Sequence, residues 1–298
     1  MVRRGPGWGL PGDRRSLSLS LYRDEDYPQV QALLRYPDRS HVHLDWQGVE
    51  EWFRNPAVTA GLGWQSESLA ALMAVSPPLA GASWLRVVAL RGGVPIESTV
   101  RQLWAYLESP LRQRGVSRVC ALSMEGWLGR ALAGADFFHV DDVVTMRYIG
   151  GERRSLPPPE RHDLILRDAQ AVDIPAVVAL DHAAFEPVWR MGADDVMAAS
   201  REAVSFTVAE LEGEVVAYEL TIPHGPGVHL VRLATAPEMQ GQGVGGALLR
   251  WALLRFRQQG IQVVTVNTQA SNQASRHLYR RFGFVDIGEE IPVWEALL

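Results

Sequence analysis

The chain repeats itself at an almost constant spacing, and this repeat constrains its fold more than any other feature. Three blocks recur in the same order, each 145 to 147 positions further along: Asp26–Leu33 and Asp173–Leu180, Gln113–Val119 and Gln258–Val264, and Phe137–Asp141 and Phe282–Asp286. Three matches in one order are improbable by chance, so we expect a tandem duplication. A length of 298 residues suits two domains of roughly 130–150 residues each.

Both halves are predicted to share one plan. Each begins with a short strand, at 17–21 and at 164–166, followed by a helix that starts at an Asp-x-Pro sequence. The second half then predicts strands 206–211 and 215–222 joined at Glu212-Gly213, strand 228–235, helix 246–259, strand 261–266, helix 273–282 and strand 284–291. The expected fold class is α/β (α+β), with a mixed, mostly antiparallel sheet flanked by helices in each half.

Composition sets the expected domain limits. Residues 1–16 are rich in Gly, Pro and Arg and predict a disordered tail. The two domains would cover residues 17–150 and 161–298. Between them, residues 151–160 contain three consecutive prolines, which suit neither a helix interior nor a central strand, and therefore predict a linker.

Charge and composition exclude several kinds of partner. A net charge of -5 and a pI near 5.9 give no electrostatic basis for binding nucleic acid or a membrane surface. The basic N-terminus lacks the apolar region of a secretory signal, and the single cysteine, Cys120, suits a reducing compartment, so we expect a cytoplasmic protein. His41, His43 and Asp45 would share one strand face, but further ligands are lacking in the sequence, so we expect no metal site.

Four glycines lie within six positions between an apolar strand and an amphipathic helix: Gly241, Gly243, Gly245 and Gly246. Glycine tolerates positive φ, and backbone amides at the start of a helix bind anions, usually phosphate. The Gly-x-Gly-x-x-Gly pattern does not follow its strand directly, and Val266 stands where a dinucleotide site needs an acidic residue. No Gly-Lys-Ser/Thr sequence follows, which argues against a nucleotide P-loop.

Two sequence blocks of the second half resemble the GNAT superfamily of N-acetyltransferases. Pro237–Gly245 (Pro-Glu-Met-Gln-Gly-Gln-Gly-Val-Gly) matches the family motif Gln/Arg-x-x-Gly-x-Gly/Ala. The second block consists of Asn272-Gln-Ala274 and of Leu278–Phe284, which reads Leu-Tyr-Arg-Arg-Phe-Gly-Phe. The blocks stand in the family's order, and the resemblance covers roughly residues 206–291.

The resemblance implies an acetyl-CoA-dependent N-acetyltransferase in which a primary amine attacks the thioester directly. It implies that coenzyme A is bound by a strand, a loop and a helix start, through Leu233, Ala234, Thr235, Gln240, Gly241, Gln242, Gly243, Val244, Gly245, Gly246 and Asn272. It also implies that Tyr279 acts as general acid on the leaving thiolate.

An amine of pKa near 10.4 needs a base at neutral pH. Glu219 is the candidate base and His229 an alternative, although both also suit structural roles. Glu186, Trp189 and Arg190 are candidates for the acceptor pocket or for an exposed loop.

The first half is expected to be a degenerate GNAT-like domain without catalytic activity. At an offset of 145, Pro95–Val100 stands opposite Gln240–Gly245, which removes every glycine and places Glu97 where phosphate would lie. We therefore expect one cofactor per chain, and a monomer because the halves pack on each other.

The acceptor stays open, as a small-molecule or peptide amine. The tandem arrangement also resembles mycothiol synthase, an acetyltransferase that acts on an aminosugar. Two alternative functions are a non-catalytic module that binds coenzyme A and a dinucleotide-dependent oxidoreductase.

Overall fold

The computed structural model describes residues 17–150 and 155–298, so the predicted tail and the first part of the predicted linker lie outside the described residues. Its helices are α1 (Tyr27–Arg35), α2 (Val49–Phe53), α3 (Ile96–Gln113), α4 (Gly126–Ala133), α5 (Ile174–Ala184), α6 (Ala193–Glu202), α7 (Val244–Gln258) and α8 (Gln273–Phe282). Its strands are β1 (Ser18–Leu21), β2 (Arg39–Val42), β3 (Thr59–Gln65), β4 (Ser68–Val75), β5 (Ala82–Leu90), β6 (Arg118–Leu122), β7 (Phe138–Ile149), β8 (Ile165–Asp168), β9 (Ser205–Leu211), β10 (Glu214–His224), β11 (Gly227–Thr235), β12 (Val263–Gln269) and β13 (Val285–Leu297).

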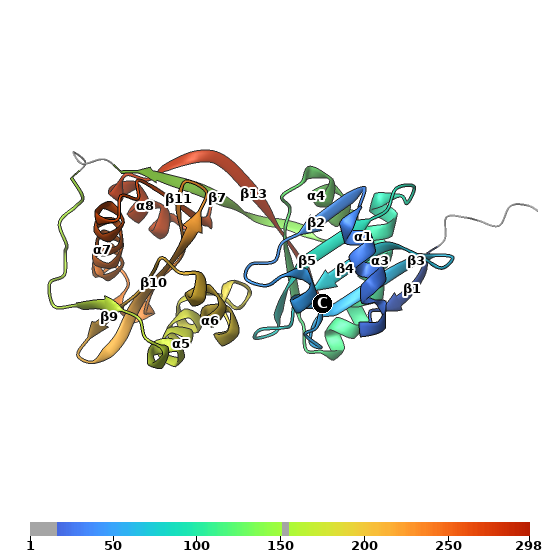
Figure 1. The fold of residues 1–298 in the computed structure, drawn as a ribbon, viewed down its shortest axis with the longest axis horizontal. Coiled ribbons are helices and arrows are strands. Elements are labelled where there is room, and N and C mark those ends of the chain that lie inside the picture. The colour runs from blue at the N-terminus through green and yellow to red at the C-terminus, as the bar shows by residue number, and fades with distance from the viewer. Residues whose placement is uncertain (1–16, 151–154) are drawn as a thin grey trace, which may run out of the picture.

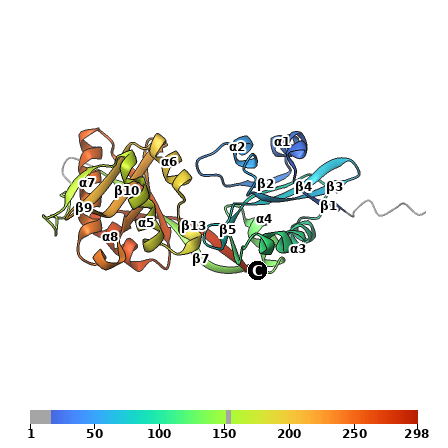
Figure 2. The same cartoon turned by 90° about the horizontal axis from the view of Figure 1, so that it is seen from below.

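These elements form two lobes that share one continuous sheet (Figure 1 and Figure 2). The strand order is β1-β3-β4-β5-β6-β13-β7-β12-β11-β10-β9-β8, and β2 pairs with β5 outside this path. The pairs β5–β6 and β11–β12 are parallel, whereas the other neighbouring strands run antiparallel. The predicted fold class, with mostly antiparallel strands flanked by helices, is confirmed.

Helices cover both faces of the sheet in the same way in each half. In the first half, α3 and α4 share one hydrophobic core, and α1 and α2 pack on the opposite face. In the second half, α7 and α8 share a core that includes Leu253 and Phe282, whereas α5 and α6 pack against Tyr218 and Leu220 on the other face. This equivalence of order and layers agrees with the predicted duplication.

The last strand of each half pairs with strands of the other half. After α4, β7 crosses to pair with β12, residue Val263 opposite Ile149. After α8, β13 crosses back to pair with β6, residue Val293 opposite Leu122. β7 and β13 also pair with each other and form the bridge between the lobes in Figure 1. The predicted linker at residues 151–160 therefore separates two halves of the sequence, but one sheet continues through both halves.

Local signals explain several element limits. Glu212 and Gly213 have φ values of 54° and 89°, as the tight turn between β9 and β10 requires. α7 begins at Val244, two residues before the predicted start, because Gly243 with φ 81° takes the N-cap position.

Cys120 is buried on β6. Within residues 17–150 and 155–298, no helix is long and apolar enough to span a membrane.

Candidate functional site

The parallel strands β11 and β12 are paired over only three residues and then separate. Val228, His229 and Leu230 pair with 264–266, and among the described strand pairs none continues on this edge beyond Leu230. A bulge interrupts the pairing of β11 with β10 at the same place, because Val231 falls between the paired residues Leu230 and Arg232. The backbone beyond the bulge therefore presents N–H and C=O groups along an edge that a ligand can pair with.

A cavity of about 700 Å³ lies in this opening, between β11, the glycine loop and α8. Ten of the eleven residues expected to bind the cofactor line it: Leu233, Ala234, Thr235, Gln240, Gly241, Gly243, Val244, Gly245, Gly246 and Asn272. The eleventh, Gln242, instead accepts a hydrogen bond from Arg161 at 3.2 Å and donates one to the Glu238 carbonyl at 2.6 Å. The fold thus brings the two sequence blocks to one cavity.

The glycine loop enters α7 through two residues with positive φ, Gly241 at 72° and Gly243 at 81°. A Cβ on Gly243 would lie 2.8 Å from the Cβ and Oε2 atoms of Glu160, so this position also lacks space for a side chain. The amides of Val244, Gly245 and Gly246 belong to the first turn of α7, where backbone N–H groups have no acceptor within the helix. Such a helix start suits a phosphate group.

A carboxylate of the chain lies against this loop. Glu160 lines the cavity, and its Oε1 atom is 2.5 Å from the Nη1 atom of Arg281 near the end of α8. Both side chains are about half exposed. A bound phosphate would therefore compete with Glu160 for Arg281. The sequence patterns did not single out either residue, because they lie outside the two blocks or at their variable positions.

Asn272 and Tyr279 both belong to α8 but face different surroundings. Asn272 caps the helix, its Oδ1 atom accepting a hydrogen bond from the Ser275 N–H group at 3.0 Å, and it lines the cavity. Tyr279 is 5 % exposed and packs in a core that includes Leu230 and Val266, the last parallel pair before β11 and β12 separate. Burial raises the pKa of the Tyr279 phenol well above its usual value, so the phenol stays protonated at neutral pH.

Residues 174–284 match the family model described as acetyltransferase (GNAT) family. The chain carries a GNAT domain. At 30 % identity over 59 residues, it is similar to a mycothiol acetyltransferase of Propionibacterium freudenreichii, and at 33 % identity over 82 residues to an uncharacterized N-acetyltransferase of Methanocaldococcus jannaschii. These matches cover 20 % and 27 % of this chain, and only 19 % and 53 % of the two relatives.

Solved structures share the fold of both halves. A GCN5-related N-acetyltransferase from Sphaerobacter thermophilus superposes with a TM-score of 0.58 at 16 % identity, covering 97 % of each chain. A tandem GNAT protein from the clavulanic acid biosynthesis pathway gives the same TM-score at 13 % identity, covering 94 % of this chain and 98 % of that chain. The fold outside residues 174–284 therefore also has GNAT-like counterparts.

The first half has the same opening as the GNAT domain, but the chain fills it. β5 and β6 pair in parallel only from Ala82 to Trp84 and then separate, and a bulge at Arg86 follows. β2 runs antiparallel along the freed edge of β5, from the pair Arg39–Leu90 to the pair Val42–Val87. An extended cofactor arm could not occupy this edge while β2 is in place.

The loop before α3 corrects the alignment at an offset of 145. α3 begins at Ile96, which is 148 positions before the start of α7, so Gly92 and Gly93 lie in the loop that precedes α3. The prediction that the first half has lost every loop glycine is therefore wrong. The loop differs instead in its N-cap, Pro95, which has no N–H group, and in the Asp38 carboxylate, which accepts a hydrogen bond from the Gly92 N–H group.

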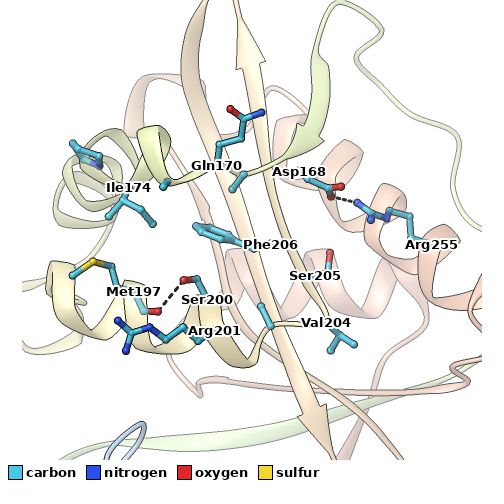
Figure 3. Close-up of a pocket in the computed structure, with 14 residues that line it drawn as sticks. Asp168, Gln170, Ile174, Met197, Ser200, Arg201, Val204, Ser205, Phe206 and Arg255 are labelled. Carbon is cyan, nitrogen blue, oxygen red and sulfur yellow. Dashed lines mark hydrogen bonds and ion pairs between the residues drawn. The ribbon is translucent and has the colours of Figure 1, made fainter.

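Glu219 lies away from the cavity beside the glycine loop, which we call the glycine-loop cavity. It is fully buried on the α7 side of β10 and accepts hydrogen bonds from Ser205 and, at 2.8 Å, from Thr221. Burial raises the pKa of its carboxyl group. Ser205 lines a different cavity of about 720 Å³, shown in Figure 3, where Asp168 and Arg255 form an ion pair near Phe206. This placement gives Glu219 no contact with the glycine-loop cavity.

The histidines singled out from the sequence are buried or partly buried, and burial lowers the pKa of each. His229 contacts the Thr265 hydroxyl at 2.8 Å, and burial lowers its pKa to about 4. His41 is 1 % exposed, and burial likewise lowers its pKa to about 4. His43 contacts Asp45 at 3.3 Å, whereas the carboxylate paired with His41 is Glu125 at 3.7 Å. Neither His41 nor His229 is charged at neutral pH.

Proposed function

We propose that the chain is an acetyl-CoA-dependent N-acetyltransferase that moves an acetyl group from coenzyme A to a primary amine. The opening between β11 and β12 carries this proposal. It joins a helix start suited to an anion, at α7, to a free strand edge at Leu233–Thr235. A pyrophosphate suits the first feature, and the amides of an extended pantetheine arm suit the second. Tyr279 does not line the cavity and packs in the core beside the last parallel pair of β11 and β12.

The reaction forms a bond between the amine nitrogen and the thioester carbonyl carbon and breaks the bond from that carbon to sulfur. The nitrogen loses a proton and the thiolate gains one. We assign the second transfer to Tyr279, because its phenol stays protonated and its ring packs where the two strands separate. Acetyl-coenzyme A, when bound, would supply the activated acetyl group, and coenzyme A would leave as the free thiol.

The base that takes the amine proton is a separate question. Glu219, the candidate from the sequence, is surrounded by hydroxyl groups on the far side of the sheet from the α5–α6 face. His229 has a pKa near 4 and is a weak base. We propose that water accepts the amine proton. An amine of pKa near 7.7–8.0 depends least on a protein base, because a larger fraction of it is already neutral at pH 7.

The proposal has one narrower form and one alternative. The similarity to a mycothiol acetyltransferase favours an aminosugar acceptor over a peptide amine. A non-catalytic module that binds coenzyme A would use the same cavity without turnover. We also propose that the chain works as a monomer, because its two halves already share one sheet. The single cysteine supports a cytoplasmic location.

A library of aminosugars, small amines and peptide N-termini, incubated with acetyl-CoA and the protein, tests the proposal through release of free thiol. We expect release with at least one amine, and we expect Tyr279→Phe to lower kcat about 100-fold. Binding of coenzyme A without thiol release from any amine would support the non-catalytic module instead. Thermal stabilisation by NAD and not by acetyl-CoA would contradict both.

A further inference from the structure

A buried ion pair joins the strand that lines the glycine-loop cavity to the helix behind it. Asp181 on α5 is fully buried and accepts hydrogen bonds from Arg232 Nε at 2.8 Å and Nη2 at 3.1 Å. The Tyr218 hydroxyl donates a third, at 2.6 Å, and the Met191 N–H group a fourth, at 2.8 Å. Because the Arg232 guanidinium binds both oxygens of Asp181, its position and its orientation are both fixed.

Arg232 is also the residue that follows the bulge in β11. Its guanidinium donates a hydrogen bond to the carbonyl of Trp189, and its Cζ atom stacks 3.9 Å from the centre of the Phe185 ring. It therefore ties the bulged strand to the segment Phe185–Gly192, which connects α5 to α6 and which we call the wall segment. Met191, bound to Asp181, fixes the far end of the same segment.

The wall segment stands between two cavities. Phe185, at its start, lines the glycine-loop cavity. Pro187, Val188, Arg190 and Gly192 line a second cavity of about 320 Å³ between the lobes, together with Trp46 and Trp84 of the first half. The indole N–H group of Trp84 donates a hydrogen bond to the Val188 carbonyl at 2.7 Å, so the first half also holds this segment.

We propose that Arg232 is a positioning residue for acetyl transfer. It fixes the wall segment relative to the bulge of β11, so that an amine that enters from the second cavity, between the lobes, reaches the thioester. This inference rests on the proposed function. Arg232 does not itself line the cavity, and its side-chain contact with the lining is the stacking on Phe185, away from the glycine loop. We therefore expect its effect on cofactor binding to be small. Its effect on turnover would be large, since misplacement by about 1 Å can lower a rate about 100-fold.

Arg232→Lys tests this proposal, because lysine keeps the charge but cannot bind both Asp181 and the Trp189 carbonyl in the same geometry. The matched control is Arg167→Lys. Arg167 also binds both oxygens of one aspartate, Asp173 at 2.7 and 2.9 Å, and it binds Glu210 at 3.0 Å, but it lies on β8 at the outer edge of the sheet. Both substitutions remove one forked ion pair, and only the first touches the wall segment.

Three measurements on the full chain separate the outcomes. Amide hydrogen exchange at residues 185–192 should rise in Arg232→Lys and stay unchanged in Arg167→Lys. The Kd for coenzyme A should stay close to wild type in both. With acetyl-CoA and glucosamine as the amine probe, kcat should fall about tenfold or more in Arg232→Lys, with little change in KM for acetyl-CoA.

Equal kcat, KM and local exchange in the two variants would overturn the proposal and leave Arg232 a structural residue. A wild-type protein that binds coenzyme A but does not acetylate glucosamine or any amine of the library would contradict the proposed function. In that case exchange at 185–192 still decides whether Arg232 holds the wall segment, and unchanged exchange in Arg232→Lys refutes it.

Discussion

Replacement of Gly243 by Ala tests whether the loop before α7 holds a phosphate group. Gly243 has a φ of 81°, where a residue with a Cβ costs roughly 1–2 kcal/mol. The added Cβ would lie 2.8 Å from Glu160, so that side chain and the loop must shift. Loss of one amide contact to a charged phosphate costs about 1.5–3 kcal/mol. We therefore expect coenzyme A to bind about 10- to 150-fold more weakly.

Gly213 provides the matched control. Its φ is 89°, it lies in the turn between β9 and β10, and no atom lies within 4 Å of its added Cβ. Gly213→Ala therefore carries similar backbone strain without reaching the cavity, and both variants should lose a few degrees of Tm. Isothermal titration calorimetry with coenzyme A gives the affinities. Wild-type affinity in Gly243→Ala, or equal weakening in Gly213→Ala, would refute the role of the loop.

Three further outcomes are expected. Glu160→Gln should bind coenzyme A about twofold to fivefold more tightly by calorimetry, because Arg281 is then free for the phosphate; weaker binding would contradict the competition. Native mass spectrometry should find one coenzyme A per chain, because β2 and Asp38 fill the opening in the first half; a second bound molecule would contradict this. Burial lowers the pKa values of His41 and His229 to about 4, whereas in the unfolded chain they are about 6.5. The unfolded chain therefore binds more protons between these pH values, so the free energy of unfolding is highest above about pH 6.5 and decreases as the pH falls toward about 4. Tm should fall over that range, and less steeply in His229→Gln; identical profiles would contradict this reasoning.

Local elements could be predicted because their signals are local. The turn at Glu212-Gly213 needs two residues that accept positive φ, and α8 has the limits predicted for it, 273–282, with Gly283 at φ 89° as its C-cap. The crossing of β7 and β13 could not be predicted in the same way. A strand that follows α4 carries the same alternating pattern whether it pairs with β6 or with β12, so the choice depends on the partner lobe.

The gathering of the predicted residues around one cavity was predictable to the extent that they lie in two continuous blocks. The ion pair of Asp181 with Arg232, outside these blocks, was not predictable in this way, because the two residues are distant in the sequence and each looks like an isolated charge. One signal was present: both charges interrupt apolar runs, and buried opposite charges usually pair. The prediction that the first half lacks loop glycines was wrong because the loop before α3 is shorter than the loop before α7. One constant offset therefore misaligned Gly92 and Gly93.

The exchange of β7 and β13 makes the two halves behave like subunits that have been fused. A single cut between residues 150 and 155 would leave two polypeptides, each with its last strand inserted beside a strand of the other, Val263–Ile149 on one side and Val293–Leu122 on the other. They would hold each other as a strand-swapped dimer does. Neither half can be removed by truncation without opening the sheet of its neighbour. A first half without catalytic activity would therefore still be indispensable, as the subunit that completes the GNAT domain.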